Sequence, residues 1–156
     1  MNAEAIVQKI SSDIKDKIQE VSLAAPLRIN VKVDREKLLA VLQYLKEQFG
    51  FTHLATISGV DLGESFEVIY HLASHLATVN VRILTPRSAP TIPSTVSIIP
   101  GAILYERELQ DMFGLVVQNI PNPRPLLLAD DWPAGEYPLR KDWHFNRPAE
   151  KIPGGK

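Results

Sequence analysis

The sequence predicts an α+β domain: a mostly antiparallel four-stranded sheet with helices packed on one face, followed by an extended proline-rich C-terminal arm. Some stretches repeat apolar residues at helical spacing, while others are short, strictly alternating and joined without long crossovers, which favours an antiparallel sheet. Prolines are frequent in the last quarter of the chain and exclude a continuous helix or a central strand there. The 156 residues suit one domain. We expect that domain at residues 1–115 and the arm at residues 116–156.

The expected elements follow the order α-β-α-β-β-β-α. A first helix is predicted over residues 4–21, where isoleucine recurs every four residues. Residues 27–33 alternate strictly and predict a half-buried strand. Asp34 is then expected to cap a second helix that continues to Phe49, and Gly50 to end it in the left-handed conformation.

Three further strands are predicted over residues 53–60, 66–72 and 78–84, because apolar side chains alternate along the last two and a glycine-containing turn separates the first two. Residues 86–100 contain four prolines and are expected to form a connection rather than a packed element. A short helix is predicted over residues 102–113, with Gly114 as its stop.

The predicted arm combines prolines with large apolar side chains. Seven prolines occur in the 36 residues from Pro121 to Lys156, together with the leucines at 126–128 and the aromatic residues Trp132, Tyr137, Trp143 and Phe145. Disordered linkers are usually poor in aromatic residues. We therefore expect the arm to lie on a surface, which composition leaves open as either its own domain or a partner.

Composition narrows the chemistry that the chain can perform. It contains no cysteine, so thiolate nucleophiles and thiolate-bound zinc or iron–sulfur centres are excluded. Its 17 basic and 18 acidic residues give no basic excess of the kind that nucleic-acid binders show. No apolar run approaches the roughly 20 residues needed to cross a bilayer. Any contact with a membrane is thus expected through partners.

Two side-chain groups could carry catalysis or metal binding. His71 and His75 have the spacing of a helical zinc pair, but His71 lies near the end of a predicted strand, which argues against it. Glu106, Glu108 and Asp111 could serve a small stand-alone enzyme as general acid and base. On a helix, however, Glu106 and Glu108 point about 200° apart. Arg107 and Asp111 can pair at i, i+4, so the cluster favours an ion-pair network over an active site.

Two stretches resemble a known family. The first runs Tyr-Glu-Arg-Glu-Leu-Gln-Asp-Met-Phe-Gly over residues 105–114, and the second runs Tyr-Pro-Leu-Arg-Lys-Asp-Trp over residues 137–143. Both, in this order, resemble the signature blocks of the 30-kDa subunit family of respiratory complex I, or NADH-quinone oxidoreductase. Residues 126–133, Leu-Leu-Leu-Ala-Asp-Asp-Trp-Pro, are more similar to the related subunits of membrane-bound energy-converting [NiFe] hydrogenases. The resemblance leaves open which of these complexes the chain serves.

The resemblance implies a cofactor-free subunit of the hydrophilic arm, peripheral on the cytoplasmic side of the cell membrane. The implied partners are a large subunit similar to the 49-kDa or [NiFe]-hydrogenase subunit and a small iron–sulfur subunit, with the redox centres in those partners. Carried over, the motif residues would order and dock the arm, and Arg140 would be the first candidate for a forked ion pair across the interface. They are Glu106, Arg107, Glu108, Asp111, Gly114, Pro138, Leu139, Arg140, Lys141 and Asp142. A homo-oligomeric α+β binding module is a further alternative.

Overall fold

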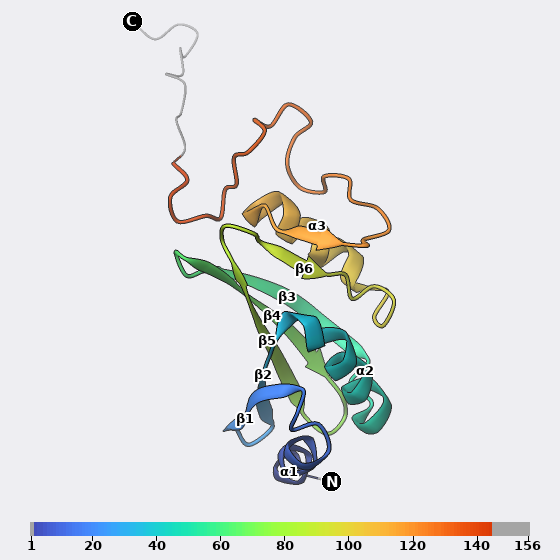
Figure 1. Cartoon of the computed structure of the whole chain (residues 1–156). Helices are drawn as coiled ribbons and strands as arrows, with labels where there is room; N and C mark the ends of the chain where they lie inside the picture. Colours follow the sequence, from blue (N-terminus) through green and yellow to red (C-terminus); the bar gives the residue numbers. More distant parts are fainter. Residues whose placement is uncertain (1, 145–156) are drawn as a thin grey trace, which may run out of the picture.

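The computed structural model describes residues 2–144, and the end of the predicted arm, residues 145–156, lies outside the described residues. The elements of the described part run in the following order (Figure 1): α1 (Ala3–Asp13), β1 (Ile18–Ala25), β2 (Arg28–Val33), the 3-10 turn η1 (Arg35–Lys37), α2 (Leu38–Phe49), β3 (His53–Asp61), β4 (Ser65–Ala73), β5 (Thr78–Pro86), β6 (Thr91–Pro93), α3 (Ala102–Phe113) and β7 (Val116–Gln118).

The main sheet has five strands in the order β1-β2-β5-β4-β3. β2 and β5 pair in parallel, and the other neighbours pair antiparallel. The predicted α+β class and the mostly antiparallel sheet are therefore confirmed. The predicted number of four strands is wrong, because β1 is a fifth strand that the sequence pattern hid.

The first helix is shorter than predicted. α1 ends at Asp13, and residues 18–25, which were expected to be partly helical, pair with β2 as an edge strand. Near the helix end, the Ser12 hydroxyl binds the carbonyl of Lys9 and the carboxylate of Asp13. Serine and aspartate side chains that bond nearby groups compete with helical hydrogen bonds, so this helix stops without a glycine or proline.

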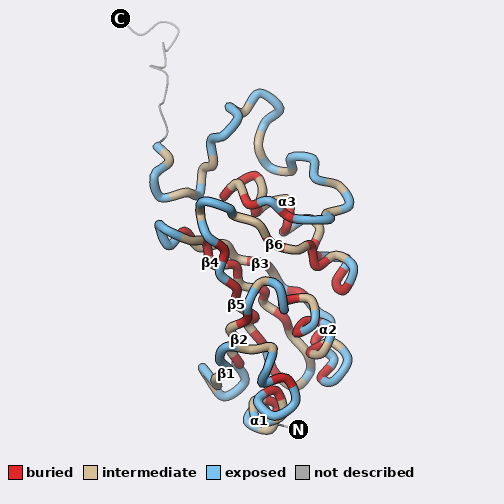
Figure 2. The backbone as a smooth tube through the Cα atoms, viewed as in Figure 1, coloured by how far each residue is buried: buried red, intermediate tan, exposed pale blue. Residues whose placement is uncertain are grey.

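The core lies on one face of the sheet. Alternate residues of β2, β4 and β5 are buried there, namely Ile29, Val31, Val33, Phe66, Val68, Tyr70, Leu72, Val79, Val81 and Ile83. All three helices pack over this face, and Figure 2 shows the buried positions of helices and strands turned toward one another. The opposite face is polar: the His71 ring lies between Ser58 and Asn80, 3.0 and 2.9 Å away, and Glu67 forms a two-bond ion pair with Arg82.

Two of the three predicted helix-end residues behave as expected. Gly50 and Gly114 both adopt the left-handed conformation, each with φ +68°, and end α2 and α3. Asp34 does not cap a helix with its side chain, because its carboxylate accepts from the Gln19 side chain instead. Within the described residues, no helix has the length and apolar character that a membrane span would require.

Residues 86–100 are more than a connection. β6, within this stretch, pairs in parallel with β7, which follows α3 along the chain. Ile92, Ile98 and Ile99 are buried. β6, β7 and α3 form one end of the elongated molecule, and the arm lies across that end (Figure 1).

Candidate functional site: the junction of α3 and the arm

The predicted motif residues gather where the arm, residues 119–144, returns over α3. α3 directs Ala102, Leu109 and Phe113 toward the sheet. The helix approaches β3 closely because Gly59 has no side chain: a Cβ atom there would lie 2.5 Å from the Phe113 ring and 3.0 Å from Leu109. This close packing of α3 on β3 fixes the orientation of the helix, and with it the direction of the side chains that do not face the sheet.

Glu106 is an internal residue. Its side chain is fully buried and accepts hydrogen bonds from the Ser94 hydroxyl (2.7 Å), the Thr95 amide (2.6 Å) and the Thr95 hydroxyl (2.8 Å). Burial, followed by the negative charge of Glu106, raises the pKa of the buried Tyr70 hydroxyl. A buried carboxylate with this many donors is well satisfied. Glu106 thus ties α3 to the loop after β6.

Arg107 and Asp111 do not pair with each other, contrary to the sequence expectation. Arg107 donates from Nε to the carbonyl of Arg124 (2.7 Å) and from Nη2 to that of Pro125 (2.9 Å). The Asp111 carboxylate accepts from the amides of Leu126 (2.7 Å), Leu127 (2.8 Å) and Leu128 (3.4 Å). The two side chains therefore hold consecutive stretches of arm backbone, and a charged acceptor strengthens such bonds.

The second motif block packs on the end of α3. Gly114 allows this, because an added Cβ would lie 2.7 Å from the Arg140 guanidinium and closer still to the Tyr137 ring. Arg140 donates from Nε to the Phe113 carbonyl (2.7 Å), and its guanidinium carbon lies 4.2 Å from the centre of the Tyr137 ring. The Leu139 amide donates to the Met112 carbonyl (3.1 Å). A forked ion pair from Arg140 to another subunit stays a prediction.

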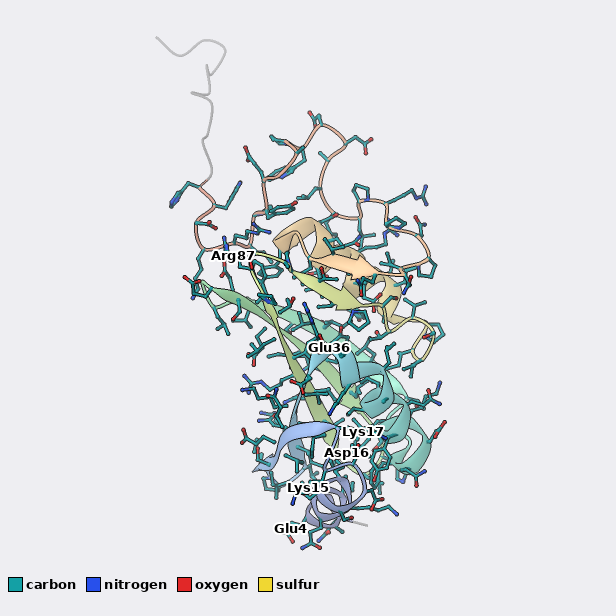
Figure 3. All side chains as sticks on the ribbon, in the orientation of Figure 1. Glu4, Lys15, Asp16, Lys17, Glu36 and Arg87 are labelled. Atoms are coloured by element: carbon teal, nitrogen blue, oxygen red, sulfur yellow. The ribbon has the colours of Figure 1, made fainter. Side chains whose placement is uncertain are left out.

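Asp61, at the end of β3, connects the arm to the sheet. Its carboxylate accepts from the Lys141 amide (3.0 Å), the Gly63 amide (2.8 Å) and the Arg87 guanidinium (2.7 Å), and Arg87 also contacts Asp142. Figure 3 labels Arg87 at the place where the arm returns to the sheet. Burial acts to raise the pKa of Asp61, but these hydrogen bonds outweigh it and lower the pKa to about 2. The hydrogen bond from Arg87 also lowers the pKa of Asp142.

Within the arm, two tryptophans close a loop that the motifs did not single out. The ring centres of Trp132 and Trp143 lie 5.8 Å apart. Trp132 donates to the Glu136 carbonyl (2.9 Å), and Trp143 donates to the Glu136 carboxylate (3.1 Å). The aromatic content of the arm was the only sequence signal for this cluster, and it did not indicate which residues would meet.

Several large apolar side chains are exposed on the outer surface of the junction. Those exposed by more than half are Leu104, Val116, Leu127 and Leu139. Glu108 on α3 is half-buried, and Pro138 is half-buried in the arm. Among residues 2–144, Glu108 has no hydrogen-bond or ion-pair partner, whereas the other charged side chains of the first motif block each have one.

This arrangement does not resemble an acid–base site. Glu106 faces the loop after β6, while Asp111 faces the arm, so the carboxylates do not converge on one place. Among residues 2–144, no three histidine, aspartate or glutamate side chains gather as a metal site would require. The junction instead holds the arm, with its exposed apolar side chains, against α3 and the end of β3.

The sequence profile described as "Respiratory-chain NADH dehydrogenase, 30 Kd subunit" matches residues 31–149, which include both motif blocks and most of the sheet. The chain belongs to this 30-kDa subunit family.

Subunits of respiratory dehydrogenases from several organisms are similar to this chain. A subunit of the F(420)H(2) dehydrogenase of Methanosarcina mazei is 37% identical over 97% of this chain and 99% of its own length. A subunit of the NADH-quinone oxidoreductase of Moorella thermoacetica is 36% identical over 72% of this chain and 78% of that protein. The matching NADH-quinone oxidoreductase subunit of a Nocardioides species is 34% identical over 81% of this chain, which spans only 53% of that longer protein.

Solved structures place the chain in the same fold. A chain in the structure of the membrane-bound sulfane sulfur reductase, an archaeal respiratory membrane complex, superimposes with a TM-score of 0.80 at 26% identity, covering 90% of this chain and 85% of the other. A trypsin-resistant fragment of Nqo5 superimposes with a TM-score of 0.65 over 78% of this chain and 99% of the fragment, at 24% identity.

Proposed function

We propose that this 30-kDa-type chain is a non-catalytic, cofactor-free subunit of a membrane-bound respiratory oxidoreductase, and that it stabilises the subunits that carry the redox centres. Its partners would be a large subunit of the 49-kDa or [NiFe]-hydrogenase type and a small iron–sulfur subunit. It would reach the cytoplasmic side of the membrane only through them. Family membership and the relatives named above support this proposal.

The observation that carries the proposal is the way in which the junction uses its polar groups. Arg107 and Asp111 are occupied by arm backbone, and Asp61 is occupied by the arm and Arg87. The leucines at 104, 127 and 139 face outward around them. Apolar side chains presented on a fixed backbone suit association with another protein, since little conformational entropy is lost on docking.

The near full-length similarity to an F(420)H(2) dehydrogenase subunit supports a complex of that kind or of the NADH-quinone oxidoreductase kind. An energy-converting [NiFe] hydrogenase is the alternative. The two differ in the large partner subunit, because only the hydrogenase requires cysteine ligands for nickel. Identification of the co-purified large subunit therefore separates them.

The test is recovery of the tagged chain from gently solubilised native membranes, with the accompanying proteins identified by mass spectrometry. We expect the wild-type chain to bring down a large subunit and an iron–sulfur subunit. Leu127→Ser and Leu139→Ser should recover much less of both. Leu27→Ser is the matched control, because Leu27 is exposed to a similar degree in the turn between β1 and β2, at the other end of the molecule.

A wild-type chain recovered alone would contradict the proposed function. Equal recovery by the two arm variants and the Leu27 control would contradict the proposed surface. Each variant changes an exposed side chain, so little change in the stability of the isolated chain is expected.

A further inference from the structure

Glu108 is a charged residue of the first motif block that the fold itself leaves unused. The other charged residues of the block already form hydrogen bonds within the chain. Glu106 binds the loop after β6, Arg107 binds arm carbonyls and Asp111 binds arm amides. Glu108 is half-buried on α3 and makes no hydrogen bond or ion pair with any other part of the described chain, residues 2–144. A carboxylate in this position is available to a group from outside.

Exposed leucines lie on α3 and on the arm segments that are bound to the helical turn after Glu108. Leu104 lies one helical turn before it and is 52% exposed. Met112 lies one turn after it, and its carbonyl holds the amide of Leu139. Asp111, three positions along the helix, holds the amide of Leu127. The exposed leucines at 104, 127 and 139, which we call the leucine rim, are thus on α3 itself or held by residues within one turn of Glu108.

A partner that covers the leucine rim would also cover the Glu108 carboxylate. Removing an unpaired carboxylate from water is strongly unfavourable. The partner must therefore either supply a cation or leave the Glu108 carboxylate hydrated. The arginines of the two motif blocks do not supply it, since Arg107 donates to the arm carbonyls and Arg140 donates to Phe113 and stacks on Tyr137. Arginine suits the role better than lysine, because its planar guanidinium is less strongly hydrated and pairs with a carboxylate through two bonds.

We propose that Glu108 anchors the partner subunit through an arginine that projects from an otherwise apolar patch and inserts inside the leucine rim. This inference rests on the proposed function and adds the chemistry of the surface that the chain recognises. In this arrangement, the ion pair between Glu108 and the partner's arginine attracts and orients the partner. The leucines provide the shape complementarity.

The first experiment compares Glu108→Gln and Glu108→Arg with the wild-type chain, each tagged and captured with its complex from gently solubilised membranes. The bound complex is then washed with buffer of rising salt concentration. Removing the charge of one member of a covered ion pair leaves the other charge unpaired, so we expect the Gln variant to bind at least about tenfold more weakly and the Arg variant to bind more weakly still. Glu4→Gln is the matched control, since Glu4 is exposed on α1, far from the junction (Figure 3).

The isolated variants provide the second readout. Because Glu108 has no partner within the described chain, Glu108→Gln should unfold at the same denaturant concentration as the wild type. Retention of Glu108→Gln equal to that of the wild type at every salt concentration would overturn the inference. If Leu127→Ser and Leu139→Ser nevertheless dissociate, the proposed function stands while the ion pair is rejected. A wild-type chain recovered alone instead rejects the proposed function itself.

The absence of cysteine allows the partner surface to be mapped directly. Gly101, at the start of α3, is exposed, and an added Cβ there meets no atom within 4 Å. A Gly101→Cys variant carrying a thiol-linked photo-crosslinker should label the partner within a short reach of Glu108. We expect the labelled surface to be apolar and to contain an arginine. A labelled surface with no basic residue would overturn the inference.

Discussion

The lobe formed by α1, α2 and the sheet differs from the α3–arm junction in what holds it together. In the sheet lobe, buried aliphatic and aromatic side chains from alternate strand positions pack under the helices. At the junction, Arg107, Asp111 and Asp61 bind backbone groups of the arm, while most arm side chains remain exposed. Figure 2 shows this difference as a buried interior beneath a largely exposed arm.

The difference shows how an arm without helix or strand can have a defined path. Apolar burial is non-directional, so it stabilises the lobe without specifying one backbone path outside it. Hydrogen bonds from charged side chains are directional and select particular amides and carbonyls. The arm is therefore positioned by polar contacts, and its apolar side chains remain available.

Phe66 is the residue where the two regions meet, and its removal should have the largest effect. It is fully buried on β4, its ring centre lies 5.9 Å from that of Phe113, and the guanidinium carbons of Arg87 and Arg140 lie 5.2 and 5.3 Å from its ring. Phe66→Ala should lower the free energy of unfolding by about 3–5 kcal/mol, measured by urea denaturation. It should also speed hydrogen exchange of the Leu139 and Lys141 amides.

Phe51→Ala is the control for Phe66→Ala, because Phe51 is equally buried but packs against Phe49 in the sheet lobe. It should cost a similar amount of stability and leave exchange in the arm, measured under native conditions, close to that of the wild type. Equal protection of the arm amides in the two variants would show that Phe66 does not couple the regions.

Alanine substitutions of the two helix-ending glycines compare the two regions directly, and their expected effect on stability is intermediate. Gly50 and Gly114 share φ +68°, but an added Cβ meets nothing within 4 Å at Gly50, whereas it meets Tyr137 and Arg140 at Gly114. Gly50→Ala should cost about 1 kcal/mol for left-handed backbone strain. Gly114→Ala should cost about 1–3 kcal/mol more, or release residues 137–143 from α3, since the added methyl overlaps the arm.

Urea denaturation and hydrogen exchange of the Leu139 amide distinguish these outcomes for Gly114→Ala. If the two glycine variants match in stability and in exchange of the arm amides, the close approach of Tyr137 and Arg140 to Gly114 has no energetic role.

Asp61→Asn should have a smaller effect than Phe66→Ala or Gly114→Ala, with a characteristic pH dependence. Loss of the charge that binds Arg87 and the Lys141 amide should cost about 1–3 kcal/mol at neutral pH. The pKa of Asp61 is lowered to about 2, so its stabilising contribution is full above the ordinary aspartate pKa of about 3.9 and is lost as the pH falls toward 2. The wild-type and variant stabilities should therefore converge on acidification. Asp16→Asn, at an exposed position before β1, should show neither the loss nor the convergence.

The sequence predicted the parts of the fold that periodic side chains determine. Alternation along β4 and β5, helical spacing in α2 and α3, and the glycines at 50 and 114 all correspond to the structure. β1 was not predicted because Ile18 and Val21 continue the helical spacing of α1 by coincidence, and no glycine or proline directly follows Asp13 to end the helix. β6 and β7 were not predicted because each has only three residues and their pairing joins distant parts of the chain.

The motif blocks identified the residues of the junction but not how they interact. Nothing in the sequence indicated that Asp111 would bind the amides of residues 126–128, because backbone acceptors and donors are present at every position. The same reason concealed the contact between Arg107 and the carbonyls of Arg124 and Pro125. The role of these motif residues in docking to other subunits stays a prediction.

The attachment of the arm through its backbone has a consequence for which side chains can be substituted. Arg107 and Asp111 recognise carbonyl and amide groups, so the side chains at residues 126–128 can be exchanged without removing those bonds. Changes that retune the exposed surface for a different neighbour need not disturb how the arm is fastened. The surface that the arm presents can therefore change by substitution while its attachment to α3 stays the same.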